Sequence, residues 1–298
     1  MKKHLNLTKK ECLKRAARYG VTVLLTHNQP KLNKGESLQM NSHELLKGYK
    51  GVYTCGLMLS PMKSAYPVLK KHLENNAQDT WTMLERDIFE NLCAWASKVC
   101  ARACLGPNAG RGQMEGTTLA RAKRTWFMFG DNVAFMALLM FELDKHILRA
   151  KKLNMLPAFR ADTVSDINLG GHFVFMYPEL YLYDYTASID RALQWKKESH
   201  LVKNRYFTFS AKEDNWSACV KALKAGINVA VPIKYEKSEG IPKSFKGFLT
   251  FDADLHDARF LDPQEDIGRI AVLYPKGPKA KKDSSGFVHQ WAKDALFI

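Results

Sequence analysis

The chain has 298 residues, of which 46% are hydrophobic and 25% are charged, so it has the composition of a globular protein that can bury a substantial core. Its longest purely apolar run, Val133–Phe141, is far shorter than the roughly 20 residues that a membrane span needs, and its N-terminus lacks the apolar core of a secretory signal. The net charge of +15 favours association with nucleic acid or other anions, although the sequence contains no motif for sequence-specific reading of DNA or RNA.

The first 50 residues are predicted to form a basic, mostly helical N-terminal extension. Helical patterns cover Thr8–Tyr19, which Gly20 ends, and a shorter stretch at Gly35–Leu46. At Gly51 the basic, polar sequence gives way to apolar runs, and residues 51–298 are predicted to form a single α/β domain. This domain begins with a buried strand at Val52–Leu59, which is ended by a Ser-Pro pair.

Helices are predicted next at Tyr66–Glu90, at Met114–Phe129 and at Asp131–Asn154, where Asp131 can cap the first turn. Beyond Pro157, short apolar runs alternate with helical segments. The predicted strands are Leu156–Ala161, Leu180–Tyr183, Tyr206–Phe209, Ile227–Val231, Phe248–Phe251 and Ile270–Tyr274, and the helices between some of them are Ser188–Ser199 and Asp214–Ala225. This alternation predicts βα units and a mainly parallel sheet.

The most distinctive segment, residues 91–106, carries three of the six cysteines, in the pattern C-x6-C-x3-C: Cys93, Cys100 and Cys104. If the segment is one helix, the three thiols pack along one stripe, with Cys93 and Cys104 about 16 Å apart along the axis. If Ser97 is instead the N-cap of a short helix, Cys93 lies on a loop and can fold back beside the other two. We favour the second arrangement, because an odd number of clustered thiols suits a metal centre better than disulfides.

The number of thiols bears on the kind of metal centre. A structural zinc ion needs four protein ligands. Cys55, His72 or His256 could supply the fourth, but none stands at the spacing of a standard zinc motif. Three thiolates with one open position fit an iron–sulfur cluster whose unique iron binds an exchangeable ligand. We therefore predict an iron–sulfur cluster of the [4Fe–4S] type, with zinc as the alternative.

Polar residues follow five of the predicted strands, and ligands bind at the carboxyl ends of strands in barrels and open α/β sheets. The alternative is that these residues are helix caps and turn residues. We predict catalytic roles for Arg160, Asp162, Asp166, Asp184 and Asp254. We predict substrate binding by Thr186, Ser210, Glu213, Asn215, Asp252, Asp257, Arg259 and Lys276, and by Arg111, which lies in a glycine-rich turn before a helix.

The order of these segments resembles a family of bacteriophage proteins with the "gene product 88" type of domain. The resemblance covers roughly Gly51–Val288 and is carried by Cys93–Leu105, Gly110–Gly112, Arg160–Asp166, Tyr183–Thr186, Phe207–Ser210, Asn228–Val231, Asp252–Asp262 and Lys276–Gly277. It implies a phage origin and a place in the cytoplasm of an infected bacterial host, and it brings no established activity. The family is in turn similar to radical-SAM-type barrels, which implies a partial or complete (β/α) barrel, a cluster held by three cysteines and S-adenosylmethionine as a co-substrate.

Two functional hypotheses follow. In the first, the cluster at the mouth of the sheet carries out a redox step, and the polar residues bind an anionic substrate such as a nucleotide or nucleic acid. In the second, the protein is a non-enzymatic, basic phage protein in which zinc or packed thiols stabilise the fold and the positive charge binds nucleic acid or a host protein. Neither hypothesis includes a membrane, and the sequence does not set the oligomeric state.

Overall fold

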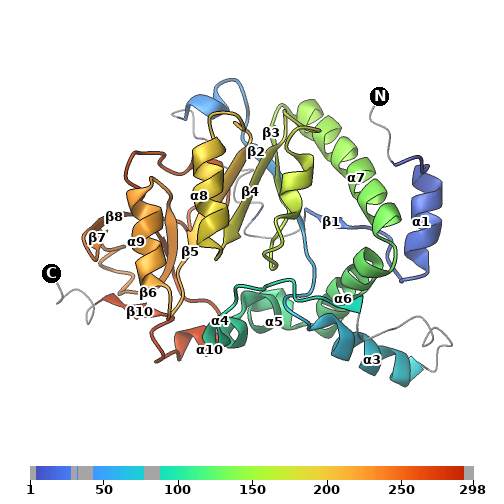
Figure 1. Cartoon of the computed structure of the whole chain (residues 1–298), viewed down its shortest axis with the longest axis horizontal. Helices are drawn as coiled ribbons and strands as arrows, with labels where there is room; N and C mark the ends of the chain where they lie inside the picture. Colours follow the sequence, from blue (N-terminus) through green and yellow to red (C-terminus); the bar gives the residue numbers. More distant parts are fainter. Residues whose placement is uncertain (1–4, 28–31, 33–42, 77–87, 292–298) are drawn as a thin grey trace.

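The computed structural model describes residues 5–27, 32, 43–76 and 88–291 of the chain. Its centre is a ten-stranded sheet with the strand order β1-β2-β3-β4-β5-β6-β9-β8-β7, to which β10 is added beside β6 (Figure 1). The parallel strands are β2 (Val52–Leu57), β3 (Leu156–Arg160), β4 (Tyr181–Thr186), β5 (Arg205–Ser210), β6 (Val229–Lys234), β9 (Ile270–Leu273) and β8 (Phe248–Asp252). The predicted α/β class and mainly parallel sheet are confirmed.

Short strands complete the sheet. β1 (Leu25–Thr26) and β7 (Ser244–Phe245) pair antiparallel with β2 and β8, while β10 (His289–Gln290) runs parallel to β6. In the described residues the two outermost strands do not pair with each other, so the sheet is open. The chain also places β9 between β6 and β8, so the order of the last parallel strands differs from their order in the sequence.

The strands form where apolar runs predicted them, with ends shifted by up to three residues between Leu156 and Leu273. Residues of β6 and β9 are buried almost throughout, because strands of a parallel sheet are covered on both faces and therefore read as continuous apolar runs. The predicted strand after Gly51 is confirmed as β2, which ends at Leu57 instead of Leu59.

The described helices cover one face of the sheet and the end of the sheet where the parallel strands terminate. They are α1 (Lys9–Ala17), α3 (Ala65–Asn76), α4 (Lys98–Ala103), α5 (Leu105–Asn108), α6 (Glu115–Gly130), α7 (Asn132–Leu153), α8 (Ile189–Glu198), α9 (Trp216–Lys224) and α10 (Pro278–Lys281). Short 3-10 helices are η2 (Glu44–Leu46), η5 (Gly110–Gln113), η6 (Leu169–Phe173) and η7 (Arg259–Leu261). The predicted helix at Gly35–Leu46 and the second half of the one at Tyr66–Glu90 fall largely outside the described residues.

Two cores lie on the helical face. The larger core packs α6 and α7 against β2 and β3, and it includes Cys12 and Ala16 of α1. The smaller core packs α8 and α9 against β5, β6 and β9. The opposite face is covered by the segment that contains η7, where Phe260 packs against Tyr183 and Leu156. Leu45 and Leu46 of the short helix η2 pack into the same cluster, so in the described residues both η2 and the segment of η7 cover this face.

The helices α6 and α7 form a bent pair beneath α1. No single helix in the described part of the chain is long and apolar enough to cross a membrane, and α6 with α7 meets that test only as a pair bent by 120°. The bend lies at Asp131, whose carboxylate caps α7 by accepting a hydrogen bond from the amide of Ala134 (3.2 Å). The same carboxylate accepts two hydrogen bonds from the guanidinium of Arg15, at 2.5 and 2.6 Å, and so holds α1 on this corner.

Replacing Asp131 with alanine is expected to lower the free energy of unfolding by about 1–2 kcal/mol, because the first turn of α7 loses its N-cap. Asp131→Asn is the matched control, since asparagine caps helices about as well as aspartate and removes only the charge. Urea unfolding followed by circular dichroism measures both variants. Equal losses in the two variants would show that the ion pair with Arg15, and not the cap, holds this corner.

Candidate functional site

The cysteine segment is built as a turn followed by two short helices. Cys93 lies in the turn at residues 92–95, as predicted. The hydroxyl of Ser97 accepts a hydrogen bond from the amide of Cys100 (3.1 Å), which confirms Ser97 as the N-cap of α4. The helix ends one residue before Cys104, whose extended backbone (φ −47°, ψ 126°) separates α4 from α5. The short helix that Ser97 caps therefore ends before Cys104, which lies at the bend between α4 and α5.

This segment lies across the carboxyl ends of the parallel strands. The amide of Asp166, in the loop after β3, donates to the carbonyl oxygen of Leu92 (2.8 Å), and Cys93 Sγ lies 3.6 Å from the carbonyl oxygen of Val164. From the loop after β5, Glu213 accepts from the hydroxyl of Ser97 (2.7 Å) and Lys212 donates to the carbonyl oxygen of Trp95 (2.9 Å). Figure 1 shows α4, α5 and α10 side by side along this end of the sheet. The thiols therefore face the end of the sheet where α/β proteins bind ligands.

The three thiols are half-buried, and none is in a disulfide. Burial raises the pKa of Cys93 to about 12 and that of Cys100 to about 11, and it also raises the pKa of Cys104. Cys104 and Cys100 both raise the pKa of Cys93 further, and Cys104 raises that of Cys100, so the three sulfur atoms lie within electrostatic range of one another. A metal centre would reverse these shifts, because a cation stabilises thiolates.

The spacing of the thiols is wider than a single ion requires. The cysteine trio is absent from the groups of the described part in which all ligand atoms lie within 4.8 Å of one another. A tetrahedral zinc ion with Zn–S bonds of ~2.3 Å holds its sulfur ligands about 3.8 Å apart. A cluster separates its cysteine sulfur atoms more widely, because each binds a different iron. At least one pair of the three sulfur atoms is therefore farther apart than the sulfur ligands of one bound zinc ion.

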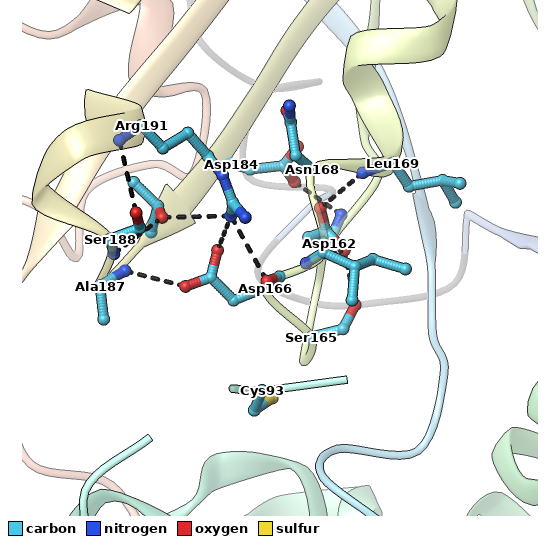
Figure 2. A network of polar contacts seen from close by, with 12 residues as sticks. Cys93, Asp162, Ser165, Asp166, Asn168, Leu169, Asp184, Ala187, Ser188 and Arg191 are labelled. Atoms are coloured by element: carbon cyan, nitrogen blue, oxygen red, sulfur yellow. Dashed lines mark hydrogen bonds and ion pairs between the residues drawn. The ribbon is translucent and has the colours of Figure 1, made fainter. Parts of the chain in front are cut away.

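Asp162, Asp166 and Asp184 form a connected network beside Cys93 (Figure 2). Asp162 accepts hydrogen bonds from the hydroxyl of Ser165 (2.7 Å) and the amide of Leu169 (3.0 Å), and its own amide donates to Asp184 (2.7 Å). Asp166 accepts from the amide of Ala187 (2.9 Å) and from the guanidinium of Arg191. These contacts join the loops after β3 and β4, so the carboxylates hold together the two loops that lie beside Cys93. Their predicted catalytic roles stay predictions.

Asp184 links the loop after β3 to Arg205 of β5. It is fully buried and accepts a hydrogen bond from Arg205 Nη1 at 2.7 Å, in an ion pair whose two side chains are 0% and 4% exposed. Burial raises the pKa of Asp184 to about 7, against the opposing attraction of Arg205. The guanidinium also lies over the ring of Phe207, 4.2 Å from its centroid, and an added Cβ at Gly170 would lie only 2.4 Å from it.

A second buried network occupies the face of the sheet opposite the helices. Arg160 donates to Asp257 (2.9 Å), and the hydroxyl of Tyr183 donates to the same carboxylate (3.1 Å). Arg160 also stacks 4.6 Å from the ring centroid of Tyr185. Burial opposes the charge of Arg160, but Asp257 and the tyrosines outweigh it and raise its pKa. Arg259, buried beside them, pairs with Asp262 at 3.3 Å. The structure thus brings together Arg160, Asp257 and Arg259, apart from the three aspartates near Cys93.

Lys276 and Asp254 form a third group, in a cleft at the carboxyl end of β9. Asp254 accepts hydrogen bonds from Lys276 Nζ (2.6 Å) and from the amide of Tyr274 (2.8 Å), while Asp252 accepts from the amide of Asp254 (2.8 Å). The cleft has a volume of about 380 Å³ and is lined by Lys237, Asp254, Tyr274, Pro275, Lys276, Gly277 and Lys281. Three lysines and one carboxylate line the cleft, so it carries net positive charge, which attracts anions.

This cleft adjoins the cysteine segment. Gly277 has a positive φ of 83°, and an added Cβ would lie 2.6 Å from the carbonyl oxygen of Asn108, at the end of α5. The helix α10 that follows Gly277 packs against α4. The lysine cleft and the thiols are thus parts of one surface at the carboxyl ends of the strands.

The remaining predicted residues make turn and cap contacts. The hydroxyl of Thr186 accepts from the amide of Ser188 (3.1 Å), and the side chain of Asn215 bonds the carbonyl oxygen of Ser210 (3.0 Å) and the amide of Lys212 (2.7 Å). Arg111 lies in η5, and its side chain is outside the described part of the structure. For Thr186 and Asn215, the alternative of cap and turn residues fits the observed contacts, whereas Ser210 contributes only its carbonyl oxygen to them.

The sequence did not reveal one group of potential metal ligands. In the described residues, His27, Cys55 and His146 offer ligand atoms that all lie within 4.8 Å of one another. The sequence offers Cys55 only as a possible fourth ligand for the cysteine segment, as it does His72 and His256. The two histidines are 119 positions apart in the sequence, so no spacing motif could connect them.

A family model described as gene product 88 matches residues 62–290, which is more than half of the chain. A search of curated proteins found no match, and a search of solved structures found none either. The matched region contains all three cysteines of the segment and every predicted site residue.

Proposed function

The chain belongs to the gene product 88 family of phage proteins, and we propose that it binds an iron–sulfur cluster through Cys93, Cys100 and Cys104 and uses it in redox chemistry on an anionic substrate. The observation that carries the proposal is the arrangement of three unpaired, half-buried thiols on a turn and a short helix across the carboxyl ends of the parallel strands. The cluster is of the [4Fe–4S] type, because three thiolates leave one iron open.

The donor set fits this group. The thiols lie within electrostatic range of one another, and their sulfur atoms do not all lie within 4.8 Å of one another, which favours a cluster over one ion. When bound, the cluster would supply one-electron chemistry. The chain's own contribution is to position the ligands: Glu213 holds the start of α4 through Ser97, and the loop after β3 holds the turn of Cys93 through Asp166 and Leu92. These bonds connect the cluster ligands to two strand ends of the rigid sheet.

The wider proposal follows the resemblance to radical-SAM-type barrels. It is supported by the parallel sheet, which α7, α8 and α9 cover on one face. A partial (β/α) barrel has its helices on one face of a parallel sheet in the same way. S-adenosylmethionine would then be the co-substrate at the open iron. In this arrangement the anionic substrate, a nucleotide or nucleic acid, binds in the lysine cleft beside α10. The protein acts in the cytoplasm of the infected bacterial host.

Anaerobic reconstitution tests the cluster directly. Purified full-length protein is treated with iron and sulfide under anaerobic conditions, desalted, and assayed for both elements. The proposal predicts a brown protein with about four iron and four sulfide per chain and an electron paramagnetic resonance signal after reduction. A colourless protein without bound iron would refute it. Addition of S-adenosylmethionine tests the co-substrate separately, because its binding to the open iron changes the resonance signal of the cluster.

A second candidate function rests on the net charge of +15 and on the lysine cleft. In it the protein is a non-enzymatic phage protein that binds nucleic acid or a host protein, and zinc or packed thiols stabilise the fold. Nucleic-acid affinity would then fall steeply with salt, because each phosphate contact releases counterions. The two candidates differ in whether iron is present.

Replacing Lys281 with alanine is expected to lower the affinity for a single-stranded oligonucleotide and to reduce the slope of log affinity against log salt by about 1, whatever the sequence. Fluorescence anisotropy at several salt concentrations measures both. Lys203→Ala is the control, because Lys203 is an exposed lysine that precedes β5 and so lies at the opposite end of the sheet. Identical slopes for the two variants would show that the cleft does not bind the phosphates.

A further inference from the structure

His27, Cys55 and His146 come together from three separate elements. His27 follows β1, Cys55 lies in β2, and His146 lies in α7. The ligand atoms of the three side chains all lie within 4.8 Å of one another, and His27 Nε2 is 2.9 Å from His146 Nδ1. Cys55 and His146 are buried, and His27 is half-buried. We infer that these side chains form a zinc site, separate from the cysteine segment, which zinc occupies with one thiolate and two imidazoles.

The backbone orients the histidine on α7 for this role. His146 Nε2 lies 3.1 Å from the carbonyl oxygen of Ala158, which can only accept a hydrogen bond. The hydrogen of the ring is therefore assigned to Nε2, and the lone pair of Nδ1 is directed at the other two ligands. An imidazole that donates its second N–H to a backbone carbonyl is the usual outer-shell arrangement of metal-binding histidines.

The ring of Tyr53 holds the two imidazoles in place. Its centroid lies 4.9 Å from that of His146, with an interplanar angle of 13°, and 5.3 Å from that of His27, with an angle of 24°. Tyr53 and Cys55 are two positions apart in β2, so they project from the same side of the strand. The rings thus need little reorientation to bind an ion.

The burial of the site agrees with this geometry. His146 is 2% exposed and His27 is half-buried, an environment that favours the neutral imidazole that a metal ligand must be. The thiol of Cys55 releases one proton to solvent when it binds the ion. Glu142, whose carboxylate accepts hydrogen bonds from the amides of Leu24 and Leu25, lies within electrostatic range of Cys55 and adds negative charge near the cation.

The ligand chemistry selects zinc. One sulfur and two imidazole nitrogens form a borderline-soft set that suits tetrahedral zinc, and three protein ligands leave a fourth position for water on the side of His27. Two nitrogen ligands of one tetrahedral zinc ion are about 3.3 Å apart. His27 Nε2 and His146 Nδ1, now 2.9 Å apart, must therefore separate by only about 0.4 Å to bind zinc. The alternative is that His27 and His146 share a hydrogen bond in the core without a metal.

Cobalt substitution tests the site, because tetrahedral Co²⁺ reports its ligands through visible absorption and a thiolate charge-transfer band. The full-length variant with Cys93, Cys100 and Cys104 replaced by alanine is stripped with a chelator and titrated with Co²⁺. The expected result is one Co²⁺ per chain, with both absorption features, displaced by one equivalent of Zn²⁺. Absence of binding by this folded variant would overturn the inference.

Ligand variants assign the ions to these residues. Adding Cys55→Ala should abolish the charge-transfer band, whereas adding Cys219→Ala, a buried cysteine in α9, should leave it unchanged. His27→Ala should weaken Zn²⁺ binding by more than the ~10–100-fold cost of losing an outer-shell partner. Because His27 is half-buried and takes no part in the cysteine segment, His27→Ala can also be compared with the unsubstituted chain if the triple variant fails to fold. Unchanged affinity in His27→Ala would overturn the inference.

Discussion

Replacing any one of Cys93, Cys100 and Cys104 with alanine is expected to lower the iron content after anaerobic reconstitution from about four per chain to less than one. Each thiol is proposed to bind a different iron. A cluster held by only two cysteines would dissociate from the protein and be oxidised more readily. The three positions come from a turn, a helix and a bend between helices, so no neighbouring thiol in the segment can take over a missing ligand. Iron and acid-labile sulfide assays measure the effect.

Cys219→Ala is the matched control, since it removes a buried thiol whose pKa burial likewise raises to about 12 but which lies on α9, within the second core. This variant should retain the full iron content. The cysteine variants should also keep their far-UV circular dichroism, because all three thiols are at the surface end of the sheet. Retention of iron in all three single variants would exclude these cysteines as cluster ligands.

Replacing Asp184 with asparagine is expected to lower the free energy of unfolding by about 3–5 kcal/mol, because the guanidinium of Arg205 would stay charged and buried without its partner. The pair is almost fully buried and joined at 2.7 Å. Arg205→Met should cost less at acidic pH, since a carboxyl group can become neutral by protonation and a guanidinium cannot. Urea unfolding at several pH values measures both variants.

The pH dependence distinguishes the two partners. The pKa of Asp184 in the folded protein is about 7, above its ordinary value of 3.8, because of burial. The folded state therefore binds more protons than the unfolded state between these values, and the stability contributed by Asp184 is lost as the pH rises from about 4 to about 7. In Arg205→Met this pH-dependent loss of stability should extend above pH 7. In Asp184→Asn the pH dependence should disappear, because the titrating carboxyl group is gone. A flat profile in Arg205→Met would show that the carboxylate is solvated in that variant.

Much of the fold could be predicted from local patterns. The apolar runs that form β3 to β6, β8 and β9 are short and bounded by turn residues. Each could therefore be predicted as a strand without knowledge of the strands beside it. The position of Cys93 outside the helix could also be derived, because Ser97 is a strong N-cap and one continuous helix would have held Cys93 and Cys104 far apart. Long-range strand order was not accessible in this way: nothing local places β9 between β6 and β8.

The candidate site was predicted in position more than in detail. Carboxylates at strand ends were expected to face a ligand, but Asp162 and Asp166 accept bonds from nearby amides and side chains, and Asp257 pairs with Arg160 from 97 positions away. The same residue types, such as aspartate, serine and asparagine, form hydrogen bonds to backbone groups and bind substrates. The sequence alone therefore cannot distinguish the two roles, and only the contacts in the structure can. Lys237 was missed because an exposed lysine carries no signal of the cleft that it lines.

The first parallel strand of the sheet lies upstream of the region that the family shares. The family model begins at residue 62, whereas β2 ends at Leu57 and hydrogen-bonds along the whole of β3. A truncation to the shared region would therefore expose β3 as an unprotected edge and uncover the apolar residues of α7 that pack on β2. Recombinant work on this chain therefore needs to retain β2, since the part of the sequence that the family model recognises is smaller than the sheet that folds.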